Sequence, residues 1–277
     1  MEKIKVMVNG IPGNMASNVA QHVLRDDRFS LIPFSLTGPE ILVDESAIYG
    51  QKIELIRPDQ RDQAIVKIKE TEGSFISVDF THPSAVNSNA EFYCQYDLPF
   101  VMGTTGGDRK RLEETVIASS IIAVIATNMA KQIVGFQAMT EYAANNFPNL
   151  FAGYSPDIRE SHQKEKVDTS GTAKDMVKYF AKLGVSFSVE DIDKERRPKI
   201  QKTRWGIPEQ FLSGHGWHTY TLVSPDGTVK FEFTHNVNGR DVYALGTLDA
   251  ITFLHNKVCW HAGAWPMVYT MIQVLKG

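Results

Sequence analysis

A polar stretch from Glu160 to Ala173 places a proton donor, a cation and an anion-binding turn close together. His162 and Lys166 are four residues apart, and Ser170-Gly171-Thr172 comes just before a helical pattern. Histidine is the natural proton donor near neutral pH, and lysine offers a point charge or a proton. The Ser-Gly-Thr turn is typical of a helix N-terminus that binds a carboxylate. These residues suit a small anion that is held and protonated. A solvated charged loop before an ordinary helix cap is the alternative that they leave open.

A second candidate site is a glycine turn near the N-terminus. Gly10-Ile11-Pro12-Gly13-Asn14-Met15 follows the β-rich run Ile4–Val8 and opens a helical pattern. Gly10 permits a tight turn, and Gly13 lets the backbone approach a phosphate beside the free N–H groups of the helix. The turn predicts dinucleotide binding. Because Gly-x-x-Gly is a shortened form of the full fingerprint, a purely structural turn is the alternative.

The end of the next β-rich run bears on the choice of cofactor. It reads Phe34-Ser35-Leu36-Thr37-Gly38 and lacks the Asp or Glu that binds the ribose diol in many NAD-specific proteins. Ser35 and Thr37 could donate hydrogen bonds to a ribose 2′-phosphate, although no arginine stands beside them in the sequence. This pattern favours NADPH over NADH, with an ordinary hydroxyl-rich loop as the alternative.

Small polar residues end three further β-rich runs. These segments are Asp79-Phe80-Thr81-His82-Pro83, Gly103-Thr104-Thr105-Gly106-Gly107 and Thr127-Asn128-Met129. Ligands of open α/β sheets bind outside the carboxyl ends of the strands, so we expect these segments to line the cofactor. Turn geometry alone would explain any one of them. We expect His82 to begin a helix rather than to perform chemistry.

The elements that must position these residues alternate through the first half of the chain. The β-rich runs are Ile4–Val8, Leu31–Leu36, Lys52–Ile56, Phe75–Phe80, Phe100–Met102 and Ile121–Ala126, and the helical patterns are Asn14–Leu24, Arg61–Lys69, Ala85–Tyr96 and Asp108–Ala118. Alternating strands and helices predict a parallel sheet covered on both faces. The expected fold is α/β, with a Rossmann-like doubly wound sheet.

The pattern changes after Asn128. The sequence predicts helices over Lys131–Phe147 and Gly171–Leu183, a strand over Tyr154–Ser161, a charged surface segment over Asp191–Ile200, and closing helices over Ala244–Lys257 and Trp265–Leu275. Ser224-Pro225-Asp226-Gly227 separates two β-rich runs, Trp217–Val223 and Thr228–Thr234, and predicts an antiparallel hairpin. We expect a dinucleotide-binding domain over 1–130 and 244–277. Residues 131–243 would form an α+β domain with an open mixed sheet for substrate binding and oligomerisation.

Composition excludes several other classes. The 277 residues are 43% hydrophobic and 22% charged with a net charge of −3, so no nucleic-acid-binding surface is expected. No apolar run reaches the roughly 20 residues of a membrane helix, and no signal segment is expected before Ile4. Cys94 and Cys259 predict neither a disulfide framework nor a metal site. A reducing compartment follows, either cytoplasm or plastid stroma. His215, Trp217 and His218 cluster without metal-like spacing, so no metal is expected.

The motifs together resemble one family, the 4-hydroxy-tetrahydrodipicolinate (dihydrodipicolinate) reductases, over nearly the whole chain. The resemblance rests on Gly10-x-x-Gly13-x-Met15, Asp79-Phe80-Thr81, Gly103-Thr104-Thr105, Asn128 and Glu160-x-His162-x-x-x-Lys166-x-Asp168 followed by Ser170-Gly171-Thr172-Ala173. Most bacterial members have a second histidine where this chain has Gln163, and a proline before the serine. Here Thr169 joins Ser170 directly, and plant-type members share both features.

The resemblance implies a role for each motif. A nicotinamide cofactor would lie across the first domain, with the cyclic dicarboxylate substrate between the domains. His162 would be the proton donor and Lys166 a second one, while Gln163 takes the place of a substrate-binding histidine without its charge. The implied cofactor residues are Gly10, Ile11, Pro12, Gly13, Asn14, Met15, Phe80, Gly103, Thr104, Thr105, Ala126, Thr127, Asn128 and Met129, and the implied substrate residues include Ser170, Gly171, Thr172 and Thr105.

These residues support a hypothesis of hydride transfer from NADPH, or less efficiently NADH, to a cyclic unsaturated dicarboxylate. An imidazolium at His162 would protonate the ring. Arg240 could clamp a second carboxylate, with an ordinary surface ion pair as the alternative. One alternative is another Rossmann-type amino-acid or semialdehyde dehydrogenase, which would not need the Ser-Gly-Thr turn. Another is an NADPH-binding redox sensor without catalysis, which would not need His162 and Lys166. The open sheet around Trp217–Thr234 predicts a homodimer or homotetramer.

Overall fold

The chain divides into two units, and the second is inserted between two segments of the first. A computed structural model describes residues 2–260 and 266–277. The first unit combines Met1–Lys131 with Asp241–Gly277, and the second is Gln132–Arg240. The assignment of cofactor binding to one domain and substrate binding to the other stays a prediction.

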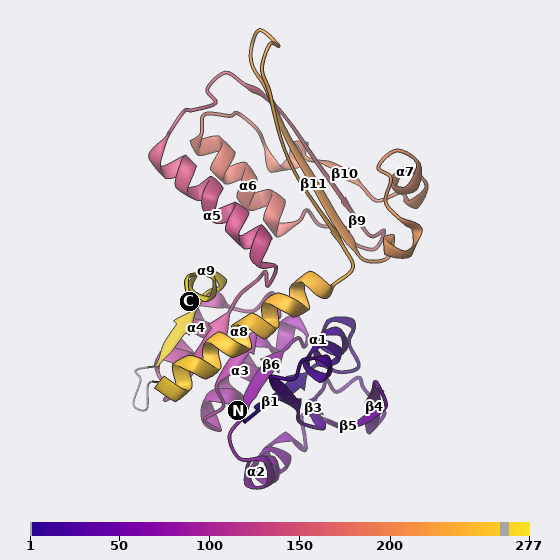
Figure 1. Ribbon diagram of the computed structural model, residues 1–277, viewed down its shortest axis with the longest axis vertical. Coiled ribbons are helices and arrows are strands. Elements are labelled where there is room, and N and C mark those ends of the chain that lie inside the picture. Colours follow the sequence, from indigo (N-terminus) through magenta and orange to yellow (C-terminus); the bar gives the residue numbers. More distant parts are fainter. Residues whose placement is uncertain (1, 261–265) are drawn as a thin grey trace. The chain divides into compact units, whose positions relative to one another are not determined.

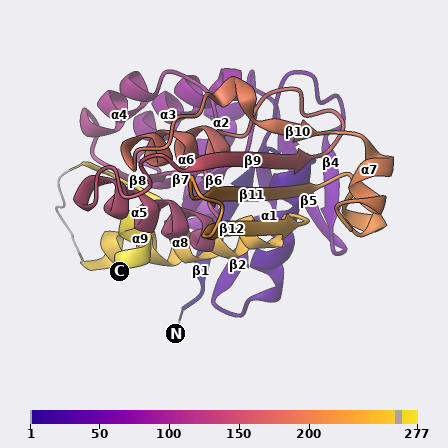
Figure 2. The same ribbon diagram turned by 90° about the horizontal axis from the view of Figure 1, so that it is seen from above.

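The first unit is built on a parallel sheet with the strand order β13-β8-β7-β6-β1-β2. Its strands are β1 (Ile4–Asn9), β2 (Phe29–Leu31), β6 (Ile76–Asp79), β7 (Phe100–Met102), β8 (Ile122–Ile125) and β13 (Met267–Tyr269). Its helices are α1 (Asn14–Arg25), α2 (Arg61–Glu72), the 3₁₀ turn η1 (Pro83–Ala85), α3 (Val86–Gln95), α4 (Arg109–Ile117), α8 (Asp241–Trp260) and α9 (Met271–Lys276). Helices α1 and α8 cover one face, and α2, α3 and α4 cover the other (Figure 2). The predicted doubly wound α/β fold is confirmed.

Strand register brings the predicted cofactor segments to one edge of this sheet. Asn9 of β1 pairs with Asp79 of β6, and Asp79 pairs with Met102 of β7. The residues that follow these strands therefore lie side by side at the carboxyl edge. The strands are anchored from both faces: Val6, Met7 and Val8 are fully buried. An uninterrupted apolar strand of this kind is expected where helices cover both faces.

Pro33 divides what the sequence suggested was one strand over Leu31–Leu36. Strand β2 stays in the large sheet, where the Ile32 N–H still donates to the Val6 carbonyl at 2.8 Å. Proline has no N–H to continue the ladder. The chain then enters a separate sheet of order β3-β5-β4. Its strands are β3 (Phe34–Leu36), β4 (Glu45–Ile48) and β5 (Gln51–Ile56).

The predicted helix over Trp265–Leu275 is wrong in its first half. Trp265 lies outside the described residues, but Met267–Tyr269 forms β13, which pairs in parallel with β8. A β-rich run beside an unpaired sheet edge gains ladder hydrogen bonds that a helix would forgo. Helix α9 begins after Thr270, where Thr270 and Gln273 form a capping box. Within the described residues, no helix is both long and apolar enough to span a membrane.

The second unit packs helices against a mixed sheet of order β10-β9-β11-β12 (Figure 1). Its strands are β9 (Ser155–His162), β10 (Asp193–Glu195), β11 (His215–Val223) and β12 (Lys230–Asn238). Its helices are α5 (Lys131–Asn146), α6 (Gly171–Lys182) and α7 (Pro198–Thr203), with 3₁₀ turns η2 (Val189–Asp191) and η3 (Glu209–Phe211). The predicted antiparallel hairpin is confirmed as β11 and β12.

Residues of alternate strand positions face α5 and α6 and form the core of this unit. Ile158, Tyr220 and Leu222 pack there against Met176 and Phe180 of α6. The opposite face of the sheet carries Trp217, Thr219 and Thr221 of β11 and the intervening residues of β9 and β12. The sheet is therefore apolar on one side and mostly polar on the other, as expected for an antiparallel sheet with one packed face.

The segment Asp191–Ile200 is exposed over most of its length, as its composition suggested, but two of its charged residues are directed inward. Glu195 is only 5% exposed, and the side chain of Arg196 forms an ion pair with the fully buried Glu160. Strand β10 pairs with β9 and carries these charges inward. Composition could not single out Glu195 and Arg196, because a buried ion pair and a solvated charge run contain the same residue types.

Candidate active site

His162 is the last residue of β9, and the sheet register surrounds it with polar side chains. His162 lies opposite Gly216 of β11, while the neighbouring row joins Glu160, His218 and His235 across three strands. All of these side chains point to the face that α5 and α6 cover, because positions two apart on a strand share a face. The imidazole of His162 therefore sits at the border of the core, with its side chain 12% exposed.

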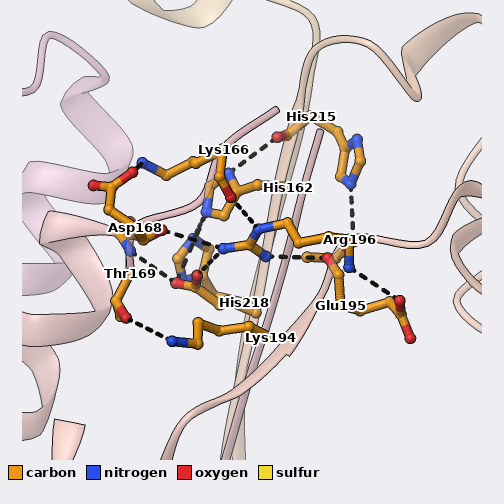
Figure 3. Close-up of polar contacts among 12 residues, drawn as sticks. His162, Lys166, Asp168, Thr169, Lys194, Glu195, Arg196, His215 and His218 are labelled. Carbon is orange, nitrogen blue, oxygen red and sulfur yellow. Dashed lines mark hydrogen bonds and ion pairs between the residues drawn. The ribbon is translucent and has the colours of Figure 1, made fainter. Parts of the chain in front are cut away.

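Both ring nitrogens of His162 have partners from β11 (Figure 3). Nδ1 lies 3.2 Å from the carbonyl oxygen of His215, and Nε2 lies 3.1 Å from Nε2 of His218. A carbonyl can only accept, so Nδ1 carries a proton and donates it to His215. In the neutral ring, Nε2 is then the acceptor of a hydrogen bond from His218.

The environment of His162 strongly favours the neutral ring. Burial, followed by the positive charges of Arg196 and Lys166, lowers its pKa to about 3. The sequence suggested an imidazolium, but the structure holds a neutral imidazole at pH 7. The 3.9 Å approach of Nε2 to Glu160 is consequently not an ion pair. Burial also lowers the pKa of His218 well below its usual value and that of His235 to about 4.

Lys166 lies in the loop between β9 and α6, tied to Asp168. Its Nζ is 2.9 Å from Oδ1 of Asp168, and this hydrogen bond lowers the pKa of Asp168. Lys166 is 24% exposed, so it can still reach a ligand. Helix α6 starts after Ser170, whose side chain makes no capping hydrogen bond. No side chain therefore caps the first N–H groups of α6, and the anion site expected at Ser170-Gly171-Thr172 stays a prediction.

Arg196 holds this loop in place, and the sequence did not identify it. Its guanidinium bonds the Glu160 carboxylate, the Lys166 carbonyl at 2.7 Å and the Asp168 carbonyl at 3.3 Å. Glu160 in turn accepts the Ser170 N–H at 3.1 Å. The carboxylate thus connects the end of β9 with the start of α6. Thirty residues separate Arg196 from Lys166, so only the parallel pairing of β10 with β9 reveals the contact.

Three other predicted residues of this unit have distinct positions. Gln163 follows His162 directly and is half-buried. The backbone carbonyl of His162 accepts a hydrogen bond from Nε2 of Gln201 at 2.7 Å. Gly171 is exposed at the first turn of α6, and Thr172 is half-buried beside it. Arg240 ends the unit with its guanidinium close to Gly214. Among the described residues it forms no ion pair, so its charge is available.

One group of possible metal ligands overlaps this site. Single ligand atoms of Glu160, His162 and His218 lie within 4.8 Å of one another. The Glu160 carboxylate is already committed to Arg196 and to the Ser170 N–H. The guanidinium and the Lys166 ammonium also make the surroundings positive, which disfavours a cation. The geometry fits an anionic substrate better than a metal ion.

In the first unit, the Gly10–Met15 turn leads directly into α1. Gly10 has φ +103°, and a Cβ there would lie 2.3 Å from the carbonyl oxygen of Phe80, so only glycine fits. Gly13 is the N-cap of α1 and no side chain caps the helix. Pro12, Gly13 and Asn14 are exposed, whereas Ile11 is buried and Met15 half-buried. The open N–H groups fit the pyrophosphate of a dinucleotide.

Asp79 is the centre of a buried network rather than a ligand-facing residue. Its carboxylate accepts hydrogen bonds from Tyr93 at 2.8 Å, Asn89 at 2.9 Å, Thr81 and Thr104. Thr104 also accepts the Thr81 N–H at 2.9 Å. The side chain of Thr104 is therefore occupied. Its backbone is occupied as well, because the N–H donates to the Asp79 carbonyl at 3.2 Å and the carbonyl accepts from Arg109 at 3.0 Å. The network fixes the loops after β6 and β7.

The remaining predicted cofactor residues differ in exposure. Gly103 accommodates the ring of Phe80, because a Cβ at Gly103 would lie 2.2 Å from it. Thr105 and Thr127 are exposed, Asn128 is half-buried, and Ala126 and Met129 are buried. The side-chain oxygen Oδ1 of Asn128 accepts a hydrogen bond from the Ala130 N–H at 2.9 Å. The predicted helix start at His82 is confirmed, because its ring caps η1.

Ser35 and Thr37 do not form the predicted hydroxyl pair. Ser35 is fully buried, and its hydroxyl accepts the Ile11 N–H at 3.2 Å. This hydrogen bond fixes the backbone of the glycine turn. Thr37 is 8% exposed and its N–H donates to Ile56 of β5 at 2.9 Å. This parallel pairing brings Arg57, the residue after β5, to the same edge. The sequence missed that arginine because it lies twenty residues further along.

A parallel sheet with a glycine turn after its first strand, joined to a helix-backed mixed sheet, defines a two-domain α/β protein of the dehydrogenase type. Residues 4–129 match the family described as "Dihydrodipicolinate reductase, N-terminus", and residues 133–275 match "Dihydrodipicolinate reductase, C-terminus". The chain belongs to the dihydrodipicolinate reductase family.

Two plant proteins are similar over nearly the whole chain. The "4-hydroxy-tetrahydrodipicolinate reductase 2, chloroplastic" of Arabidopsis thaliana is 45% identical over 273 residues, covering 99% of this chain and 77% of that protein. The "Probable 4-hydroxy-tetrahydrodipicolinate reductase 1, chloroplastic" of Oryza sativa subsp. japonica is 44% identical over 271 residues, covering 98% and 78%. These similarities agree with the plant-type features at Gln163 and Thr169.

A solved structure has the same fold. It is the "Dipicolinate bound Dihydrodipicolinate reductase from Paenisporosarcina sp. TG-14", with a TM-score of 0.65 and 19% identity, covering 98% of this chain and 99% of that one. At this identity the similarity supports the fold alone. Membership of the family supports a nicotinamide cofactor for the chain.

Proposed function

We propose that this protein catalyses the NAD(P)H-dependent reduction of 4-hydroxy-tetrahydrodipicolinate (dihydrodipicolinate) to tetrahydrodipicolinate in lysine and diaminopimelate biosynthesis. The observation that carries the proposal is the joint placement of His162, Lys166 and the open N-terminus of α6 by the Glu160–Arg196 ion pair. Family membership supports it independently. The cofactor, when bound, supplies a hydride.

The residues of the second unit suit a dicarboxylate that accepts a proton. Lys166 and the Ser170–Thr172 turn bind one carboxylate, and Arg240 binds the other. Gln163 donates a hydrogen bond to the same ligand without adding charge. Negative charge near Lys166 and Arg196 offsets two of the causes that lower the pKa of His162. Substrate binding thereby makes a proton on His162 less costly, and His162 supplies it to the reduced ring. General acid catalysis of this kind contributes roughly 10²–10⁴-fold.

The first unit binds the nicotinamide cofactor at the carboxyl edge of its sheet. The Gly10–Met15 turn receives the pyrophosphate, and Phe80 with the Gly103–Thr105 and Ala126–Met129 segments lines the remainder. A buried network around Asp79 holds two of these loops. These assignments follow from the open N–H groups of α1 and from the positions of the strand ends.

NADPH oxidation with substrate generated in situ by the upstream synthase tests the reaction. We expect turnover, with His162→Ala lowering kcat at least 100-fold and Lys166→Ala weakening both substrate affinity and kcat. NADPH binding without turnover would favour the redox-sensor alternative. Turnover of amino-acid or semialdehyde substrates instead would favour another dehydrogenase. Full activity of His162→Ala would remove it from the mechanism.

We propose that the protein prefers NADPH to NADH as its cofactor. Phe34–Gly38 contains no acidic residue, and Arg57 lies beside Thr37 at the end of β5. Arg57 now bonds Asp44 at 2.7 Å, and Asp44 is 80% exposed, so the guanidinium can turn to a 2′-phosphate. The carboxylate of Glu40 near Gly38 opposes this preference.

Paired kinetics with both cofactors tests the preference through two opposite substitutions. We expect Arg57→Gln to lower kcat/KM for NADPH about tenfold and to leave NADH unchanged, because the 2′-phosphate loses a charged partner. Glu40→Gln should shift the ratio the other way. Equal kcat/KM values for NADPH and NADH in the unsubstituted protein would contradict the preference.

We further propose a homodimer or homotetramer formed through the face of the mixed sheet that α5 and α6 leave open. Thr219 and Thr234 form a cross-strand pair on that face, with their hydroxyls 3.3 Å apart. Light scattering should give a mass of two or four chains. Thr219→Arg should dissociate the assembly. A monomer at micromolar concentration would rule out the proposal.

The protein is proposed to work in a reducing compartment, the cytoplasm or a plastid stroma. Cys94 and Cys259 are both free in the structure, and the two plant relatives carry "chloroplastic" in their names. Cell fractionation with an antibody against the protein tests this. Recovery of the protein from an oxidising compartment would contradict it.

A further inference from the structure

A fully buried glutamine lies behind the backbone of His162. Gln201 belongs to α7, and its side chain has no exposure to solvent. Its Nε2 donates to the carbonyl of His162 at 2.7 Å and to the carbonyl of Glu195 at 3.2 Å. These two carbonyls belong to the last residues of β9 and β10. One side chain therefore joins the ends of two neighbouring strands.

The backbone pairing between β9 and β10 stops where this side chain begins. The register of the two strands reaches only as far as Glu195. The next two N–H groups of the chain, those of Arg196 and Arg197, donate to Oε1 of Glu195 at 3.0 and 2.7 Å. They are used within their own segment and do not continue the ladder. Gln201 supplies a donor for the His162 carbonyl at this place.

The contacts of the Gln201 amide fix its orientation. Each hydrogen of the NH₂ group has one carbonyl as its acceptor. The reverse orientation would set the amide oxygen against two other oxygens that can only accept. Oε1 is buried, and within the described part of the chain it has no hydrogen-bond partner. Because an unpaired buried acceptor costs free energy, the contribution of Gln201 lies in its two donor bonds.

The His162 carbonyl is the first of three that hold the loop with the candidate site residues. The carbonyl of Gln163 accepts the Lys166 N–H at 3.0 Å, and the carbonyl of Lys166 accepts a hydrogen bond from Arg196 at 2.7 Å. Arg196 thus holds the later part of the loop. Gln201 holds its start, where the peptide group after His162 sets the direction in which Gln163 leaves the strand.

We propose that Gln201 is a positioning residue, which fixes the peptide group between His162 and Gln163 and so directs both side chains toward the substrate. This rests on the proposed reductase function and adds to it a residue that does not touch the substrate. The ring of His162 is held from β11 by His215 and His218, and its backbone is held from α7 by Gln201. His162 is therefore fixed from two sides.

Gln201→Met tests the proposal, because methionine has a similar length and volume but no donor. We expect kcat to fall about tenfold, since a displacement near 1 Å at a reacting group can cost about 100-fold and the shift here is smaller. KM for NADPH should stay within about twofold, because the glycine turn belongs to the first unit. Gln210→Met makes the same chemical change at an exposed position and should keep kcat. Unchanged kcat in a Gln201→Met protein with a native circular dichroism spectrum would overturn the positioning role.

Gln201→Glu separates the loss of a donor from a defect in packing. Glutamate has the same shape as glutamine, and its neutral carboxyl can donate one hydrogen bond, whereas the ionised carboxylate can only accept. Burial favours the neutral form. We expect kcat, relative to the unsubstituted protein at the same pH, to rise as the pH falls from 9 to 6. The same ratio for Gln201→Met should stay constant. A Gln201→Glu protein as impaired as Gln201→Met at every pH would contradict the donor role.

Hydrogen–deuterium exchange tests the positioning without any turnover. Peptides that cover residues 162–168 should exchange faster in Gln201→Met than in the unsubstituted protein, while peptides from β1 should not change. Faster exchange in a protein that has no reductase activity would support the positioning and leave only the proposed reaction refuted. Equal exchange over residues 162–168 in the two proteins would show that Gln201 does not hold the loop and would end the proposal.

Discussion

Gly216 determines how closely the imidazole of His162 can approach β11. A Cβ at position 216 would lie 3.0 Å from Cε1 and 3.4 Å from Nδ1 of His162. Such a contact is tighter than nearly all real Cβ contacts, so the ring would have to move by a few tenths of an ångström. That movement would lengthen the bonds to His215 and His218 that fix the tautomer. Glycine at this position therefore serves the site rather than the backbone.

We expect Gly216→Ala to keep the fold and lower kcat about tenfold. A displacement near 1 Å at a reacting group can cost about 100-fold, and the shift here is smaller. Steady-state kinetics with circular dichroism measures both effects. Gly135→Ala on α5 is the control, because a Cβ there meets nothing within 4 Å. Loss of folded signal in Gly216→Ala, or unchanged kcat, would disagree with this account.

The candidate site residues could be grouped from the sequence because they lie close together in it. His162, Lys166 and Ser170-Gly171-Thr172 fall within eleven positions, so their spacing alone indicated an anion site. Their supporting residues were not predictable, because Arg196 and His218 reach the site only through strand pairing. The prediction that Ser35 contacts the cofactor was wrong for a related reason. A hydroxyl at a strand end can face the ligand or the neighbouring turn, and the sequence does not indicate which.

At the scale of elements, β10 fixes the loop that carries Lys166. Arg196 bonds two carbonyls of that loop and the Glu160 carboxylate, while the adjacent Arg197 pairs with Glu195 and is 76% exposed. Breaking a buried ion pair by removing one partner costs roughly 3–5 kcal/mol, whereas an exposed pair contributes about 0–1 kcal/mol. The Glu195 carboxylate is itself 6% exposed, but it also accepts the backbone N–H groups of Arg196 and Arg197, whereas Glu160 depends on the Arg196 guanidinium for its charge partner.

We expect Arg196→Met to lower the free energy of unfolding by about 3 kcal/mol and kcat/KM at least 100-fold, because Glu160 is left buried and unpaired. Arg197→Met should cost less than Arg196→Met, because Glu195 keeps the backbone N–H groups of Arg196 and Arg197 as hydrogen-bond partners. Urea unfolding and steady-state kinetics measure the pair side by side. Similar effects of the two substitutions would mean that β10 does not organise the loop.

The elements themselves were predicted where local pattern and tertiary environment agree. The parallel strands of the first unit are buried on both faces, so their apolar runs identified them. The helix over Trp265–Leu275 failed because a short apolar run has no decisive period, and the free edge of β8 captured Met267–Tyr269 as a strand. Pro33 was the visible sign that Leu31–Leu36 was two strands, since proline cannot continue a ladder.

At the scale of the whole molecule, the buried histidines couple stability to pH. Burial lowers the pKa of His162 to about 3 and that of His235 to about 4, and it also lowers the pKa values of His215 and His218. In the unfolded chain these groups titrate near pH 6.5. Below that pH the unfolded state binds protons that the folded state does not. The histidines therefore stabilise the fold fully above about pH 6.5, and this contribution is lost as pH falls toward 4 and 3.

As the pH falls from 6.5 to 4.5, the free energy of unfolding should decrease by up to about 1.4 kcal/mol per pH unit for each such histidine. The carboxylates with lowered pKa values, such as Asp168 and Glu195, add their effect mainly below this window. We expect the urea midpoint to fall steeply from pH 7 to pH 5, and His235→Gln to reduce the slope by about one proton. A midpoint that stays constant from pH 7 to pH 5 would show that these histidines are not held neutral in the folded protein.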